Sequence, residues 1–345
     1  MVKGCRAKPR ICGLGIKLRK NMRKEIFVTG LLISCILVGM IILGLSRVDF
    51  FSALSLPGVS GSLELPQNCM REPDGYKRWT CLGPYFKNLT MQTSAKTAVS
   101  EASKLKQQRL VSDCHILTHF IGEANLEKHD FDIGGAIASC AVGECRYGCV
   151  HGVVERYSHN ELDPYKFISK ISGMCESLEG DFAQKMNCAH GVGHGLFAHN
   201  YLSPQEAIYA CEALGEQWTP FCIDGVAMQN MDQYLYLDEE GLREVIPRIC
   251  APFKLEDRQI SVPHRLMNYC VTRMASGLLF YTGYDIERSE ALCEELPQDV
   301  DRGVCKDGMY EHIARKKPSN IDMEEFLQSP FSDIRILPVF LPPPQ

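Results

Sequence analysis

The feature that most constrains the fold is a short frame around cysteine that recurs along the chain. In four places a cysteine is followed two residues later by His or Asp and then by Gly; a fifth cysteine, Cys270, lacks both. The five cysteines lie 34 to 48 residues apart, the length of two-helix repeats, which bury a continuous core only by stacking on their neighbours. The four complete frames are Cys149-Val150-His151-Gly152, Cys188-Ala189-His190-Gly191, Cys222-Ile223-Asp224-Gly225 and Cys305-Lys306-Asp307-Gly308.

Helix signals between these frames indicate a hairpin in each repeat. Asp163 followed by Pro164 is typical of a helix start, because Asp caps the first turn and Pro fits the first helical position. Ser203 and Glu206 have the spacing of a capping box. No strand-like alternation of comparable length occurs, so we predict an all-α fold, an array or closed toroid of disulfide-stapled helical hairpins behind one N-terminal transmembrane helix. Further helices are expected at 93–109, from Asp113, at 130–140 and from Cys305 to about Lys317.

The cysteine count indicates an oxidising compartment. Cys5, Cys12 and Cys35 lie before or within a predicted membrane span, and the other fourteen of the 17 are an even number. Outside the cytoplasm such cysteines mostly form disulfides. The simplest pairing closes each hairpin across its own loop and ties the first segments together: Cys140–Cys149, Cys175–Cys188, Cys211–Cys222, Cys250–Cys270, Cys293–Cys305, Cys69–Cys81 and Cys114–Cys145.

An uncharged run from Ile26 to Leu45 is long enough to cross a bilayer as a helix, which takes about 20 residues. Residues 1–25 hold nine Lys and Arg against the single acid Glu25, a bias typical of a cytoplasmic end. We therefore expect a single-pass protein anchored in the membrane through residues 26–46, with its main domain extracellular, periplasmic or lumenal. A cleaved signal peptide is the alternative, although its apolar region is usually about 7–15 residues long.

The charge distribution argues against a nucleic-acid partner. The whole chain carries −5; since residues 1–25 carry +8 and residues 26–46 carry no charge, the remainder carries −13. An acidic domain lacks the basic face that neutralises phosphates. On the same side of the membrane, the sequon Asn88-Leu89-Thr90 is a candidate glycosylation site.

These features divide the chain into five predicted segments. A Ser, Gly and Pro rich stretch follows the span and is typical of a stalk. The segments are a basic cytoplasmic tail at 1–25, a transmembrane helix at 26–46, a stalk with the Cys69/Cys81 segment at 47–92, a helical-hairpin repeat domain at 93–328 and an extended Pro-rich tail at 329–345.

Pairs of metal-binding side chains recur four residues apart inside the predicted second helices. Residues at this spacing project from one helix face, so each pair forms a two-ligand clamp. If equivalent helices present equivalent faces to a common interior, the clamps converge. Imidazole with carboxylate suits zinc, iron or manganese. The clamps are His115/His119, His151/Glu155, His190/His194 and Asp307/Glu311, and Asp224 has Met228 at the second position.

This set favours a metal-dependent hydrolase or oxidase, with a divalent or redox metal ion as its cofactor. The chain contains no C-x-x-C-H, Walker, H-E-x-x-H or G-x-S-x-G motif. Glu155 and Glu311 are the candidate general bases. The candidate metal ligands are His115, His119, His151, His190, His194, Asp224 and Asp307.

A structural role for the frame is the alternative, in a non-catalytic binding or scaffold protein. The disulfide then closes the hairpin, and the His or Asp caps it. The Gly costs about 1 kcal/mol relative to Ala inside a helix, and its repetition indicates close backbone packing or open space beside the His. This interpretation leaves the second polar residue, one turn later, unexplained. His129, His159, His199, His264 and His312 lack a clear ligand partner and are expected to be structural.

Overall fold

The computed structural model describes residues 64–140, 145, 147–161, 163–178, 182–198, 202–255, 260 and 265–328. Contacts divide the chain after Glu64 into two units, and the described helices all belong to the second. None of these helices combines the length and the apolar composition that crossing a bilayer requires. The predicted span at 26–46, the basic tail at 1–25 and the Pro-rich tail at 329–345 lie outside the described residues.

The described residues form α-helices and no strands, which confirms the predicted all-α class. Three 3-10 helices, at Cys69–Arg71, Glu212–Leu214 and Ala251–Phe253, join some of them. The α-helices are α3 (Tyr76–Gln92), α4 (Ala95–Gln107), α5 (His115–Lys128), α6 (Ile133–Ser139), α7 (Gly148–Ser158), α8 (Pro164–Ser177), α9 (Phe182–Ala198), α10 (Pro204–Cys211), α11 (Thr219–Asp232), α12 (Glu239–Ile249), α13 (Leu266–Thr282), α14 (Ile286–Cys293), α15 (Asp299–Lys316) and α16 (Met323–Gln328).

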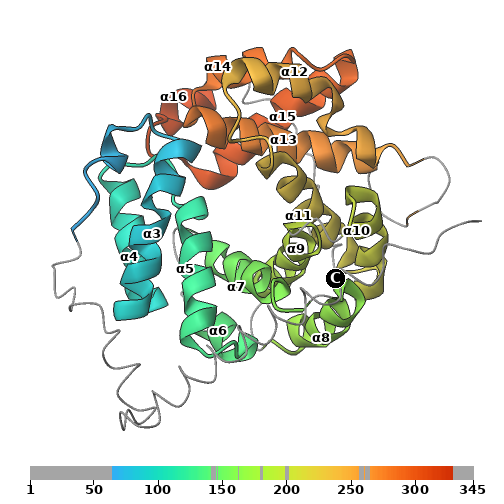
Figure 1. Ribbon diagram of the computed structural model, residues 1–345. Helices are drawn as coiled ribbons and strands as arrows, with labels where there is room; N and C mark the ends of the chain where they lie inside the picture. Colours follow the sequence, from blue (N-terminus) through green and yellow to red (C-terminus); the bar gives the residue numbers. More distant parts are fainter. Residues whose placement is uncertain are drawn as a thin grey trace, which may run out of the picture. The chain divides into compact units, whose positions relative to one another are not determined.

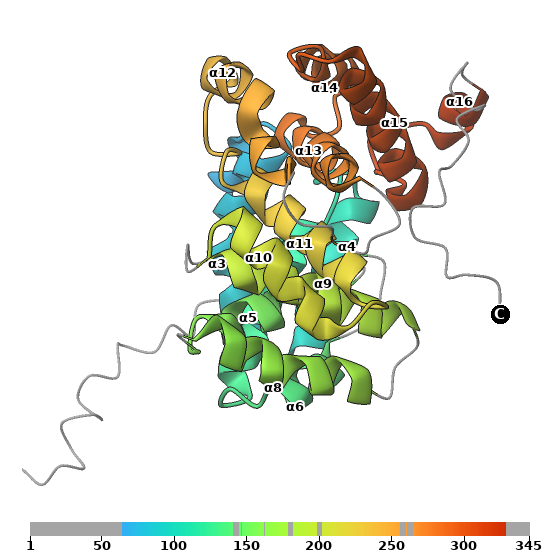
Figure 2. The same ribbon diagram turned by 90° about the vertical axis from the view of Figure 1, so that its right-hand side faces the viewer.

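The odd-numbered helices form an inner layer (Figure 1). Each contacts the next along the chain, from α3 through α5, α7, α9, α11 and α13 to α15, and α13 also contacts α3. The helices α6, α8, α10 and α14 each precede an inner helix and pack against it. Figure 2 shows α8 and α10 on the outer side of α9 and α11. Every inner helix from α7 to α11 therefore has inner neighbours on both sides and an outer helix behind it.

The helical core begins before residue 93, the predicted start of the repeat domain. Helix α3 packs against α5. Trp79 of α3 meets Phe280 of α13 edge to face, with 5.6 Å between the ring centroids, and both side chains are fully buried. Residues 76–92, which the sequence analysis grouped with the Cys69/Cys81 segment, are thus part of the helical core.

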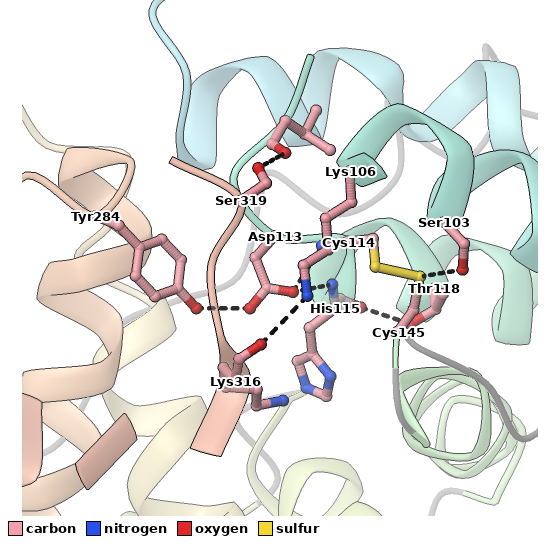
Figure 3. Close-up of a disulfide and its surroundings, with 11 residues drawn as sticks. Ser103, Lys106, Asp113, Cys114, His115, Thr118, Cys145, Tyr284, Lys316 and Ser319 are labelled. Atoms are coloured by element: carbon pink, nitrogen blue, oxygen red, sulfur yellow. Dashed lines mark hydrogen bonds between the residues drawn. A yellow bond between two sulfur atoms is a disulfide. The ribbon is translucent and has the colours of Figure 1, made fainter. Parts of the chain in front are cut away.

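The end of the described chain returns to its beginning (Figure 3). The backbone N–H of Ser319 donates to the carbonyl oxygen of Ser112 at 3.1 Å, and its hydroxyl donates to that of Val111 at 2.8 Å. The Tyr284 hydroxyl donates to the buried Asp113 carboxylate at 2.5 Å. These bonds join the segment before α5 to the segments that follow α13 and α15, so the start of α5 lies near the ends of α13 and α15.

Local signals in the sequence account for the helix starts. The Asp163 carboxylate accepts backbone N–H groups from the first turn of α8, and Ser203 with Glu206 forms a complete capping box at α10. Both starts agree with the sequence analysis. Helix α5 begins at His115, and Asp113 accepts two backbone N–H groups at its start, at 2.6 and 2.9 Å.

The structure contains all seven predicted disulfides. Five of them link the end of a shorter helix to the first half of the inner helix that follows it in the chain, so each hairpin is closed at the end where its frame lies. Disulfides in this number are typical of an oxidising compartment outside the cytoplasm. The pairs are Cys69–Cys81, Cys114–Cys145, Cys140–Cys149, Cys175–Cys188, Cys211–Cys222, Cys250–Cys270 and Cys293–Cys305.

Two of the frame glycines are sites of direct backbone contact between inner helices. A methyl group on Gly152 of α7 would overlap the carbonyl oxygen of His119 in α5. A methyl group on Gly225 of α11 would overlap the carbonyl oxygen of His190 in α9 in the same way. The predicted close packing at these glycines is confirmed, and it sets the spacing of the helices that carry the histidines.

Substitution Gly152→Ala should therefore destabilise the fold by about 1–3 kcal/mol, since the added methyl forces α5 and α7 apart. Gly173→Ala in α8 is the control, because nothing lies within 4 Å of the position that its methyl would take. Removing a helical glycine there should stabilise the protein by up to about 1 kcal/mol. Guanidinium unfolding with the disulfides intact measures both; equal effects at the two positions would refute the backbone-contact account.

Candidate metal centre

Five histidines from three neighbouring inner helices gather in the interior. His115 and His119 lie on α5, His151 on α7, and His190 and His194 on α9, and none is more than 8% exposed. Potential ligand atoms of His115, His119 and His151 all lie within 4.8 Å of one another, as do those of His151, His190 and His194. His151 belongs to both groups. The structure thus brings together all the histidines of the predicted ligand set.

The hydrogen bonds of His190 and His194 determine where their lone pairs lie. Nδ1 of His190 is 2.9 Å from a carboxylate oxygen of Asp224, and Nδ1 of His194 is 2.8 Å from the amide oxygen of Gln229. Each Nδ1 therefore carries a proton and donates it, which leaves the lone pair of the neutral ring on Nε2. The two Nε2 atoms are 3.1 Å apart. Two lone pairs at this distance repel each other unless a cation or a proton lies between them.

The pair on α5 has a similar spacing between its inner nitrogens, and one of its two outer nitrogens also meets a carboxylate. Nδ1 of His119 is 3.3 Å from a carboxylate oxygen of Glu155, and the Nε2 atoms of His119 and His115 are 3.3 Å apart. Two nitrogens that bind one tetrahedral zinc lie about 3.3 Å apart, because each Zn–N bond is about 2.0–2.1 Å long. Both histidine pairs have a spacing close to this value. A carboxylate that accepts from the outer ring nitrogen is the usual partner of a metal-binding histidine.

His151 supplies an unpaired nitrogen at the junction of the two groups. Its Nε2 is 3.0 Å from the side-chain oxygen of Asn187, whose own amide nitrogen donates to the Ala183 carbonyl. Nε2 is thus the protonated nitrogen of His151. Its Nδ1 is buried and has no hydrogen-bond partner among the described residues. A buried polar atom left without a partner costs about 1–3 kcal/mol, a cost that a bound metal ion would remove.

Burial favours the neutral form of four of these imidazoles. It lowers the pKa of His115, His151 and His190 below the usual value for histidine, and lowers that of His194 to about 3. Neutral imidazole is the form that binds metals. For Glu155, burial alone would raise the pKa, but the hydrogen bond and the charge of His119 hold it at about 2. The centre thus combines these four neutral rings with the ionised carboxylate of Glu155 beside His119.

Asp224 is held between two partners. Besides accepting from His190, its carboxylate receives Nε and Nη2 of Arg273 of α13 in a two-pronged ion pair. Its side chain is 5% exposed. Burial alone would raise the pKa of Asp224, but the charge of Arg273 and the bond from His190 hold it at about 2. The structure places Asp224 as the partner of a histidine, and its own oxygens are already engaged.

A cavity of about 280 Å³ adjoins the centre. His115, His151 and His190 line it, together with residues from α11, α13 and α15. Glu311 of α15 lies on its wall and forms an ion pair with Arg315. Of the two predicted general bases, Glu311 therefore lines this cavity. Glu155 lies one helical turn after His151 on α7 and bonds His119 instead.

Asp307 is the predicted ligand that the structure does not bring to the histidines. Its side chain is exposed, and it belongs to neither group of potential ligands. In the other repeats, the residue two positions after the cysteine does line the cavity. Thr272 of α13, two residues after Cys270, is one example. Asp307 lies on the exposed face of α15, so the geometry does not support its expected role as a metal ligand.

Four residues around the site escaped the sequence analysis. Arg273, Asn187 and Gln229 each act through a contact with a residue on a neighbouring helix, and no spacing rule within one helix marks such a contact. His312, expected to be structural, is buried beside the cavity, and its Nε2 is 2.9 Å from the Tyr284 hydroxyl. Among the other histidines, His129 bonds Ser139, His159 is exposed, and His199 and His264 lie outside the described residues.

Comparison of the chain with protein-family models, with curated proteins and with solved structures found no match. The site is therefore interpreted from its own geometry.

The ion pair beneath His190 yields a stability prediction. Arg273→Met should destabilise the protein by about 3–5 kcal/mol, since it leaves the Asp224 carboxylate buried without its cation. Arg243→Met is the control, because Arg243 pairs with Glu239 and Glu295 at the surface and its loss should cost about 0–1 kcal/mol. Denaturant unfolding of both variants at neutral pH measures the difference, and similar losses would contradict the buried role of Arg273.

Proposed function

We propose that the five-histidine cluster binds a transition metal ion and that the chain is a metal-dependent enzyme of an oxidising compartment. The observation that carries this proposal is the pair of Nε2 atoms of His190 and His194, 3.1 Å apart with both protons committed to the opposite nitrogens. A cation between them removes the repulsion of the lone pairs. The unpaired Nδ1 of His151 supports the same conclusion.

The ligand set narrows the choice of metal. Nitrogen ligands alone suit zinc or iron better than manganese, which prefers carboxylate and water oxygens. Glu155 and Asp224 accept protons from the outer nitrogens of His119 and His190, so they orient these rings and are not themselves needed as ligands. Zinc or iron bound by neutral imidazoles is therefore the proposed cofactor.

The proposed reaction is hydrolysis in the adjoining cavity, with Glu311 as the general base. A metal ion in such a site lowers the pKa of a water molecule and polarises a substrate oxygen. Burial raises the pKa of Glu311, although the charge of Arg315 opposes the shift, and a raised carboxyl pKa improves proton acceptance near neutral pH. Glu155, with its pKa near 2, is a weak base and serves to position His119. The closed form of the helical array fits this proposal, because all the inner helices from α5 to α15 then face one cavity.

The double substitution of His190 and His194 by Ala tests the metal site. It should abolish metal binding and leave the helical content nearly intact, because the disulfides and apolar faces hold the hairpins together. Metal content per chain is measured by elemental analysis after purification from an oxidising compartment without chelator, and helicity by circular dichroism.

The matched control for this test is His129→Ala. His129 lies just past the end of α5 and bonds Ser139, away from both histidine groups, so its loss should leave metal content unchanged. A wild-type protein without metal, or a double variant that keeps its metal, would favour the alternative of a non-catalytic scaffold.

We also propose that residues 26–46 anchor the protein in a membrane and that the helical unit lies outside the cytoplasm. The seven disulfides support this location, since reducing conditions in the cytoplasm rarely permit them. Asn88 of the candidate glycosylation sequon is exposed on α3, as a modified residue must be.

Protease added outside sealed cells should therefore cleave the chain beyond residue 47 and release the helical unit. Cytoplasmic protease should reach only the basic tail at 1–25. Immunoblotting with an antibody against the helical unit distinguishes the two cases, and digestion of that unit from the cytoplasmic side would reject the proposed topology.

A further inference from the structure

A chain of two hydrogen bonds runs from the interior to His312, on the wall of the cavity beside the histidine cluster. The Tyr284 hydroxyl lies 2.5 Å from a carboxylate oxygen of Asp113, a bond that Figure 3 shows. The same hydroxyl lies 2.9 Å from Nε2 of His312, which is buried and lines the cavity. The protonation of the two outer members decides which way these bonds run.

Both outer members have a defined charge. Burial alone would raise the pKa of Asp113, but the charge of Lys316 and the bond from Tyr284 hold it below the usual value for aspartate. Burial and the charge of Lys316 lower the pKa of His312 well below the usual value for histidine. At neutral pH, Asp113 is therefore an ionised acceptor and His312 is a neutral ring with one N–H.

The tautomer of His312 follows from these charges. An ionised carboxylate has no proton to give, so Tyr284 donates its single proton to Asp113 and its oxygen accepts from Nε2 of His312. The lone pair of His312 is then on Nδ1. This Nδ1 has no hydrogen-bond partner among the described residues, and it is not sealed from water as Nδ1 of His151 is. Since His312 lines the cavity, the lone pair is available to an occupant.

The charged groups on the cavity wall balance one another. Each of its two carboxylates forms an ion pair with an arginine of the same wall, Asp224 with Arg273 and Glu311 with Arg315. The charge of Lys316 acts on the buried Asp113 carboxylate. A charged occupant would have to separate one of these partners, and a buried charge without compensation is costly. The wall therefore favours an uncharged occupant.

The size and the apolar part of the cavity restrict the occupant further. Met186 of α9, Phe221 of α11 and Tyr147 at the start of α7 also line it. Aromatic and thioether side chains pack well against a flat ring. The volume of about 280 Å³ lies near the lower end of the range of about 300–1,000 Å³ for small-molecule sites. The cavity thus suits a small molecule with an apolar body and one polar group.

We infer that the cavity binds a small uncharged amide, which donates its N–H to Nδ1 of His312 and packs its apolar body against Met186 and Phe221. This inference rests on the proposed function and deepens it, because it names the substrate class of the same site. Among uncharged groups that can be hydrolysed, an amide carries the donor that a simple ester lacks. Its carbonyl oxygen is the kind of atom that a metal ion polarises. His312 recognises the substrate, and Tyr284 is a positioning residue that keeps the ring proton on Nε2.

Three ring compounds of similar shape test the inference by isothermal titration calorimetry on the full-length chain. Benzamide has the N–H donor, acetophenone has a methyl group in its place, and benzoate has a charged oxygen there. Benzamide should bind about tenfold more tightly than acetophenone, because a buried acceptor left unpaired rejects the analogue without a donor. It should also bind more tightly than benzoate to chain dialysed against a chelator, a treatment that removes any metal ion able to attract the anion.

Three results of this titration would overturn the inference. They are the absence of benzamide binding, equal affinity for benzamide and acetophenone, and tighter binding of benzoate than of benzamide to the dialysed chain.

The variant His312→Gln identifies the acceptor. The amide nitrogen of Gln can still donate to Tyr284, but no acceptor remains at the place of Nδ1. Benzamide affinity should fall about tenfold while acetophenone affinity stays unchanged, so the discrimination is lost. His129→Gln is the matched control, because His129 bonds Ser139 and does not line the cavity. Circular dichroism confirms folding, and a folded His312→Gln variant that still discriminates would refute the inference.

Nitrogen NMR of protein labelled with ¹⁵N-histidine tests the role of Tyr284. In the wild-type protein the His312 ring should carry its proton on Nε2, and the Nδ1 signal should shift when benzamide is added. Tyr284→Phe should give a mixture of both tautomers and weaken the discrimination. Tyr236→Phe, at a side chain that is 73% exposed, should change neither. A proton on Nδ1 of His312 in the wild-type protein would overturn the inference, whether or not the Tyr284 variant folds.

Metal analysis of the same samples separates this inference from the proposed function. If the wild-type protein binds no metal but discriminates benzamide from acetophenone through His312, the metal proposal fails and the amide site stands. If metal binds normally and no discrimination is measured, the amide site fails and the metal proposal stands.

Discussion

Direct contact between the backbones of neighbouring inner helices is the constraint on which the rest of this structure depends. Gly152 lies against the His119 carbonyl, and Gly225 lies against that of His190, so α5 meets α7 and α9 meets α11 without side chains between them. Because the helices lie this close together, the ring nitrogens of the histidines on α5, α7 and α9 lie within 4.8 Å of one another in each of the two groups. The disulfides hold each hairpin at the end that carries its frame, and thereby fix the position of each inner helix along its own axis.

Close packing also explains the electrostatic character of the site. Bringing five imidazoles below 9% exposure removes them from water, and four of the rings donate a proton to Glu155, Asp224, Gln229 or Asn187. Two of these acceptors are held in place by a second contact. Arg273 donates to the Asp224 carboxylate, and the Asn187 amide nitrogen donates to the Ala183 carbonyl. The arrangement leaves the lone pairs of the inner nitrogens directed at one another, which is the basis of the proposed metal site.

The candidate site was predictable to the extent that it follows from helical spacing. His115/His119 and His190/His194 are four residues apart, and this alone places each pair on one face. Convergence of α7 and α9 followed from the repeated frame, and that of α5 from its own pair of histidines at the same spacing. Asp307 shows the limit of that reasoning, because the same frame position on α15 is exposed. Arg273 was missed for a related reason: it stands in the frame that lost its His or Asp, and its role comes from a contact with Asp224 on another helix.

The all-α class, the seven disulfides, several of the helix starts and the pairing of histidines within α5 and within α9 were predictable from the sequence. All of these depend on residues close together in the chain, where capping, helical periodicity and loop length act directly. The packing of the helices was needed to show that α3 belongs to the core, that His151 joins both histidine groups, and that Arg273, Arg315 and Lys316 line the same cavity as those histidines. These relations join helices that lie far apart in the sequence, and the packing angles and axial shifts that set them arise from the whole set of side-chain contacts.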